Sequence, residues 1–151
     1  MNDVIRNARE TALGILQPSQ RDLEYGLGLH RDSLVIDAYG FSPRCAVDGQ
    51  ALAAAFESGS SDATLRDLAE EMSMTRCAVN EGERREYLMA WEAAGVTGIF
   101  QNAGEESQAP LTLLKRLARF TYVTDTLRGQ VCRAVTAQDV LRARELGQRC
   151  L

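Results

Sequence analysis

The sequence predicts a mostly helical α/β fold with two to three parallel strands. Two short runs rich in apolar and β-branched residues, 33–39 and 96–100, lie far apart in the chain. Helical patterns fill the segment between these runs and continue after the second. Strands buried in parallel sheets are nearly continuous apolar runs, and helices connect them as right-handed crossovers. The 151 residues suit a single domain, 1–151.

The first 32 residues predict two helices. Asp3 is suited to cap the first helix, and Pro18 ends it. Its apolar residues recur at helical spacing: Val4, Ile5, Ala8, Ala12, Ile15 and Leu16. Ser19 begins a second helical run to about Leu29, and the strand 33–39 follows.

Three helical patterns fill the segment between the strands. Asp48 is suited to cap the first, and the polar segment 57–62 separates it from the second. The second has one apolar stripe, formed by Leu65, Leu68, Ala69 and Met72. Asn80 begins the third, which ends before the strand 96–100.

The last third predicts two more helices and a further strand. Pro110 suits the first position of a helix, and 131–135 is a short extended segment. Thr136 and Asp139 resemble a capping box in which Asp replaces the usual Glu or Gln. Gly147 ends that helix, and 149–151 read as the start of a third strand.

Composition and charge exclude some classes of function. The net charge of −4 argues against nucleic acid as a partner, because phosphate binding requires a basic face. No segment is apolar for long enough to span a membrane, and the N-terminus does not resemble a signal peptide, so we expect a cytoplasmic protein. The four cysteines form no C-x-x-C pair. We therefore expect reduced, partly buried thiols.

Three stretches carry a resemblance to a known family. They are 29–41 (LHRDSLVIDAYGF), 94–100 (AGVTGIF), and 113–117 (LLKRL) followed by 135–140 (VTAQDV). The three stretches resemble segments of the membrane (renal) dipeptidase family and occur in that family's order. The resemblance implies that the chain is the N-terminal portion of a dipeptidase-like (β/α)8 barrel. It also implies a two-zinc site and hydrolysis of dipeptides by metal-activated water.

The chain departs from this family at the metal site. The family's strand-one His corresponds to Tyr39 and its Asp to Phe41. Phenylalanine has no donor atom, and a neutral tyrosine is a poor zinc ligand. The family's remaining ligands would lie beyond Leu151. We therefore expect no metal ligand and no cofactor in this chain, although the family would imply zinc. We also expect the chain to be a truncated barrel that is inactive alone.

Asp37, Tyr39, Phe41 and Glu105 are the candidates for a remnant pocket. All four follow or end strands, where active sites of β/α barrels are built. In the simpler alternative, Asp37 caps a turn or hydrogen-bonds backbone amides, Tyr39 fills the emptied metal position and Glu105 lies in a solvated loop. The single histidine, His30, is expected to interact favourably with a helix end.

Three hypotheses about function remain open. The first is a dipeptidase-family protein. The second is a non-catalytic protein that self-associates or binds a partner, because exposed strand edges must be paired or covered. The third is a small α/β domain of unrelated function.

Overall fold

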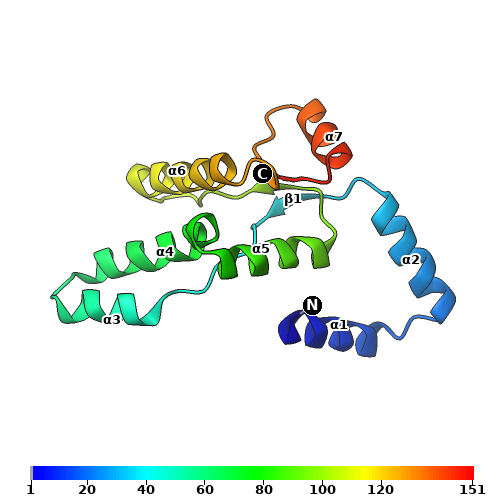
Figure 1. Ribbon diagram of the computed structural model, residues 1–151, viewed down its shortest axis with the longest axis horizontal. Helices are drawn as coiled ribbons and strands as arrows, with labels where there is room; N and C mark the ends of the chain where they lie inside the picture. The colour runs from blue at the N-terminus through cyan, green and yellow to red at the C-terminus, as the bar shows by residue number, and fades with distance from the viewer. Residues whose placement is uncertain (1) are drawn as a thin grey trace.

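The computed structural model describes residues 2–151, which form seven helices and a small sheet (Figure 1). In chain order the elements are α1 (Asp3–Leu16), α2 (Gln20–Asp32), β1 (Ile36–Gly40), α3 (Gly49–Glu57), α4 (Asp62–Val79), α5 (Glu81–Ala94), β2 (Gly98–Gln101), α6 (Pro110–Thr126), β3 (Val131–Cys132), α7 (Ala137–Glu145) and β4 (Arg149–Cys150). The mostly helical α/β class is thereby confirmed.

The sheet has four parallel strands in the order β1-β2-β4-β3. The prediction of two to three strands was one strand too low, because β3 and β4 are two-residue strands that pair with each other. β1 and β3 form the two outer edges. The four strands make an open sheet among the described residues, so the barrel stays a prediction.

Local side-chain caps start most helices where the sequence predicts. Ser19, Asp48 and Asn80 each accept hydrogen bonds from backbone N–H groups in the first turn of the helix that follows. The capping box at the start of α7 is present, with Asp139 in the reciprocal position. The first helix differs: its cap is Asn2 rather than Asp3.

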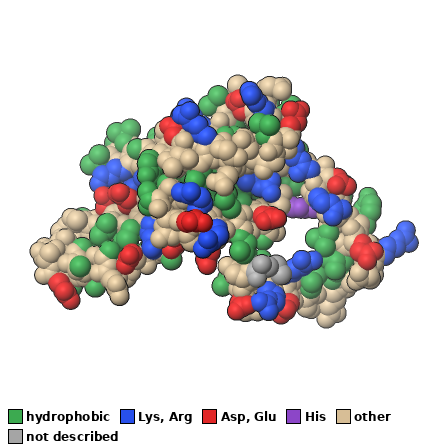
Figure 2. All heavy atoms as spheres, viewed as in Figure 1, with side chains coloured by type: hydrophobic (Ala, Val, Ile, Leu, Met, Phe, Trp, Pro, Cys, Tyr) green, Lys and Arg blue, Asp and Glu red, His purple; other side chains and the backbone are tan. Residues whose placement is uncertain are grey.

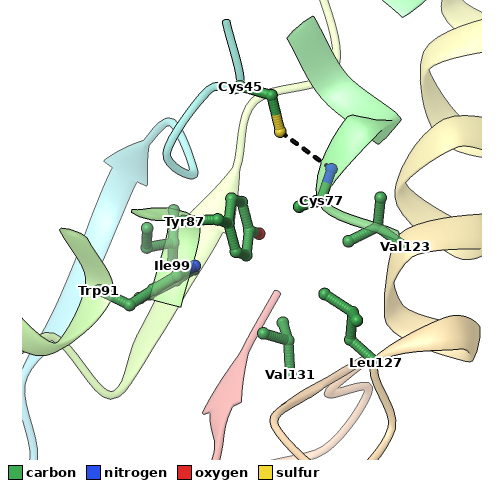
Figure 3. Packing of buried hydrophobic residues seen from close by; sticks show 8 residues of the cluster. All are labelled: Cys45, Cys77, Tyr87, Trp91, Ile99, Val123, Leu127 and Val131. Atoms are coloured by element: carbon green, nitrogen blue, oxygen red, sulfur yellow. Dashed lines mark hydrogen bonds between the residues drawn. The ribbon is translucent and has the colours of Figure 1, made fainter. Parts of the chain in front are cut away.

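Apolar side chains from α4, α5, α6 and the sheet form one buried cluster (Figure 3). Its members are Cys45, Cys77, Tyr87, Trp91, Ile99, Val123, Leu127 and Val131. The indole of Trp91 and the ring of Tyr87 meet edge to face, with centroids 6.5 Å apart. Burial raises the pKa of Tyr87 to about 12, so this phenol stays neutral.

The helices α1 and α2 form an arm beside the body of the protein (Figure 1). Neither helix buries a residue, and open space lies between the arm and the body (Figure 2). The end of α2 is held at two points. The Arg144 guanidinium donates to the carbonyl of Arg31, and the His30 ring lies against Gly95. The predicted placement of His30 at a helix end is confirmed.

Gly95 makes the His30 contact possible. It ends α5 with φ +65°, a left-handed conformation that favours glycine. A Cβ at this position would lie 2.5 Å from Cε1 of His30. The C-terminal end of α2 therefore packs directly on the α5 backbone.

Removal of the α5 cap should destabilise the whole core, because α5 carries Tyr87 and Trp91. Asn80 Oδ1 accepts a hydrogen bond of 3.0 Å from the N–H of Glu83. We expect Asn80→Ala to lower the free energy of unfolding by about 1 kcal/mol. Asn80→Asp retains the acceptor and should match the wild type. Urea unfolding followed by circular dichroism tests both, and equal losses in the two variants would contradict the capping role.

Candidate functional site

The carboxyl ends of β1 and β2 bring two polar side chains together. Nδ2 of Asn102, directly after β2, donates a hydrogen bond of 2.8 Å to the hydroxyl oxygen of Tyr39 on β1. Asn102 Oδ1 accepts from the N–H of Gly104, which fixes the orientation of the amide. Tyr39 itself is 71% exposed. The two strand ends are therefore joined by a polar contact at the surface.

Asp37 and Phe41 lie on the same segment as Tyr39 without forming an enclosed pocket. Asp37 Oδ1 accepts a hydrogen bond of 3.1 Å from the N–H of Tyr39, so this carboxylate fixes the local backbone. The rings of Tyr39 and Phe41 meet edge to face at 6.4 Å, and Phe41 is 57% exposed. The geometry agrees with the simpler alternative in which Asp37 accepts a hydrogen bond from a backbone amide, here within β1.

Glu105 lies in the exposed loop between β2 and α6. Within residues 2–151, no hydrogen bond or ion pair joins its carboxylate to Asp37, Tyr39 or Phe41. Of the four predicted site residues, Asp37 and Tyr39 lie on β1, Phe41 follows the end of that strand, and Glu105 lies in a different loop. Sequence analysis missed Asn102, although its place at the end of an apolar run is a signal for a polar residue at this edge.

The strand ends do not fit a zinc site. Phe41 has no donor atom, and the Tyr39 hydroxyl is already engaged by Asn102. Among the described residues, no group of three or more His, Cys, Asp or Glu side chains is placed to hold a metal ion. No hydrolytic step through a metal follows from this arrangement.

Comparison with known proteins finds no match for this chain. No family model matches it, and neither a curated protein nor a solved structure is significantly similar. The resemblance to membrane dipeptidases therefore stays a prediction from the residues alone. Within the described part of the chain, no helix is both long and apolar enough to cross a membrane.

An apolar groove of about 410 Å³ opens on the surface beside the sheet. It lies between β1, β2, β4 and α7, and its lining includes Leu34, Ile36, Phe100, Val135, Val140 and Leu141. Phe100 is 64% exposed, whereas its neighbour Ile99 is buried in the core cluster. Successive strand residues face opposite sides, so Phe100 marks the side of β2 away from the core. A parallel sheet is ordinarily covered on both faces, and here one face is largely open.

A second feature that sequence analysis missed is a charged cluster between α4 and α6. The buried Arg119 guanidinium donates to Asp67 at 2.8 Å and to Glu70 at 3.0 Å. Lys115 and Arg116 add ion pairs to the same two carboxylates. Every charge in the cluster has a partner, so the cluster joins two helices and offers no free group for catalysis.

Proposed function

We propose that this chain is a non-catalytic assembly subunit of dipeptidase-like β/α type, which associates with a second copy through the uncovered face of its sheet. The observation that carries the proposal is the size of the exposed surface. The chain exposes 10041 Å². A compact monomer of 16.6 kDa would expose roughly 7,600 Å².

The excess is of the size that a stable dimer buries. It amounts to roughly 2,400 Å² for one chain and 4,800 Å² for two. Obligate homodimers bury roughly 2,000–5,000 Å² in total and have apolar interfaces. The groove provides such an apolar surface, and the unburied arm adds further area to be covered. We favour a second copy over a foreign protein as the partner, because a single two-fold axis covers the same face on both chains.

The strand ends support the non-catalytic part. Tyr39 and Phe41 occupy the positions where the resemblance places the first metal ligands, and both have other roles here. The strands β1 and β2 are parallel neighbours that are joined through α3, α4 and α5. This arrangement is compatible with the proposed dipeptidase-like β/α type. It is also compatible with other β/α proteins, so the dipeptidase likeness rests on the sequence resemblance.

A matched pair of substitutions tests the surface. Phe100→Glu places a charge in the groove, and Phe56→Glu makes the same change on α3, where Phe56 is similarly exposed at 68%. We expect the wild type to have twice the monomer mass of 16.6 kDa by light scattering. Phe100→Glu should raise the dimer dissociation constant tenfold or more, because burial of an unpaired charge in the interface is costly. A tenfold change corresponds to about 1.4 kcal/mol of binding free energy. Phe56→Glu should leave the dimer intact.

Three results would reject parts of this proposal. A wild type that stays monomeric up to its solubility limit, or a dimer that only Phe56→Glu dissociates, would reject the groove as the interface. Hydrolysis of dipeptides by the purified chain with added zinc, above the rate with zinc alone, would reject the non-catalytic part. The two measurements are independent, so each part fails or stands separately.

A further inference from the structure

Two cysteines that are far apart in the sequence face each other at the edge of the core. The Cys45 Sγ, on the segment after β1, accepts a hydrogen bond of 3.1 Å from the backbone N–H of Cys77 on α4 (Figure 3). The N–H of Cys45 in turn donates to the carbonyl of Ser73 at 2.8 Å. Both thiols are free, and Cys45 is 8% exposed whereas Cys77 is fully buried. Two backbone hydrogen bonds thus hold the Cys45 sulfur against α4.

Side chains on α4 and α5 hold the segment that carries Cys45. The N–H of Ala46 donates to Glu83 at 3.0 Å, and the carbonyl of Ala46 accepts from Arg76 at 2.7 Å. Arg76 and Glu83 also form an ion pair of 3.4 Å. The chain is therefore held at Cys45 itself and at the next residue, Ala46.

The two thiols have different tendencies to ionise. The backbone N–H of Cys77 donates to the Cys45 sulfur, whereas the Cys77 thiol donates to the carbonyl of Met74 at 3.9 Å. Contact with the Cys77 thiol, together with this backbone hydrogen bond, lowers the pKa of Cys45, although burial opposes this. Arg76 favours the Cys45 thiolate and Glu83 disfavours it. The same thiol contact, together with burial, raises the pKa of Cys77. Cys45 is thus the nucleophile of the pair and Cys77 the second thiol.

We propose that Cys45 and Cys77 are an oxidation site at which a peroxide forms an intramolecular disulfide. The Cys45 thiolate attacks one peroxide oxygen, the O–O bond breaks, and the departing hydroxide takes up a proton to become water. Cys77 then gives up its proton and attacks the Cys45 sulfur of the sulfenic acid. The S–S bond forms, the S–O bond breaks, and a second water leaves. For hydrogen peroxide, two thiols are oxidised to one disulfide and one peroxide is reduced to two waters.

A second pair of cysteines provides an internal comparison. Cys132 and Cys150 are partners in the register of β3 and β4. Burial raises the pKa of Cys150 to about 11, and it also raises the pKa of Cys132. Each therefore stays a thiol near neutral pH and reacts slowly with peroxide. Burial thus raises the pKa of both cysteines in this second pair, whereas contact with Cys77 lowers the pKa of Cys45.

The test is peptide mapping after mild oxidation. The folded protein is treated with one equivalent of hydrogen peroxide, the remaining thiols are alkylated, and the chain is digested with trypsin. Arg44 and Arg76 directly precede the two cysteines, so the linked peptides begin with Cys45 and Cys77. We expect a loss of two hydrogen atoms in the intact mass, this one cross-linked pair, and alkylated Cys132 and Cys150.

Serine variants separate the two roles. Cys77→Ser should leave a sulfenic acid on Cys45 that a 1,3-diketone reagent traps, whereas Cys45→Ser should give neither trapping nor a disulfide. Cys132→Ser should oxidise like the wild type. Circular dichroism confirms that each variant is folded before oxidation. Alkylation of both Cys45 and Cys77 after peroxide, earlier oxidation of Cys132 and Cys150, or a cross-link between chains would each overturn the proposal.

Discussion

Replacement of Trp91 by alanine is expected to lower the free energy of unfolding by about 3–5 kcal/mol. Trp91 is 1% exposed and is the largest side chain in the core cluster, where it contacts Tyr87 edge to face. Its removal leaves a cavity at the point where α5 meets the sheet, and this cavity adds to the lost transfer free energy. Natural domains are stable by only about 5–15 kcal/mol, so the variant should be close to unfolding.

Two further variants show whether packing causes the loss. The indole Nε1 of Trp91 has no hydrogen-bond partner among the described residues. Trp91→Phe therefore loses no hydrogen bond, retains most of the volume, and should cost only about 1–1.5 kcal/mol. Glu86→Ala, an exposed change on the same helix, should be nearly neutral. Urea unfolding at fixed protein concentration compares the three variants. Equal losses for Trp91→Ala and Trp91→Phe would show that a buried partner of Nε1 matters more than volume.

The sequence predicted the elements whose causes are local. Caps act within one helical turn, so Ser19, Asp48 and Asn80 were identified from residue type and spacing alone. Strands β1 and β2 were identified because burial makes such segments apolar and β-branched. Both observed strands nevertheless begin two or three residues later than the predicted runs, at Ile36 and Gly98. Strand ends depend on pairing with neighbours, which a single segment does not encode.

The features that sequence analysis missed all depend on pairs distant in the chain. Asn102 contacts Tyr39 across 63 positions, and Arg119 contacts Asp67 across 52. No spacing rule connects such residues, because the fold alone brings them together. For the same reason, its position after a strand grouped Glu105 with Asp37, Tyr39 and Phe41, whereas the structure places Glu105 in a separate exposed loop.

Replacement of Arg119 by methionine should lower the free energy of unfolding by about 2–3 kcal/mol at pH 7. Methionine keeps the aliphatic volume and removes the guanidinium, which donates to Asp67 and Glu70 and lies 3.4 Å from Glu71. Burial opposes the charge of Arg119, yet the carboxylates together outweigh burial and raise its pKa. The loss stays below that for a fully buried ion pair because these carboxylates are partly exposed to water.

The Arg119→Met deficit should shrink as the pH falls. Hydrogen bonds from Lys115, and then from Arg119, lower the pKa of Asp67 in the folded protein. Because the pKa of Asp67 is lower in the folded than in the unfolded protein, its charge stabilises the fold at pH values above the unfolded pKa, which is about 3.9. This stabilisation is lost as the pH falls through the folded pKa. In the variant, the pKa of Asp67 rises toward its ordinary value, so less stability depends on pH. We expect a large deficit at pH 7 and a much smaller one at about pH 3.

Arg128→Met is the matched control for this prediction. Arg128 follows α6 closely in the chain and pairs with Asp125 at 3.2 Å, but both side chains are exposed. Exposed pairs of this kind contribute little, so the variant should lie within about 0.5 kcal/mol of the wild type at both pH values. Urea unfolding at the two pH values compares all three proteins. A deficit of the same size at pH 7 and pH 3 for Arg119→Met would mean that lost packing, rather than lost ion pairs, destabilises the α4–α6 contact.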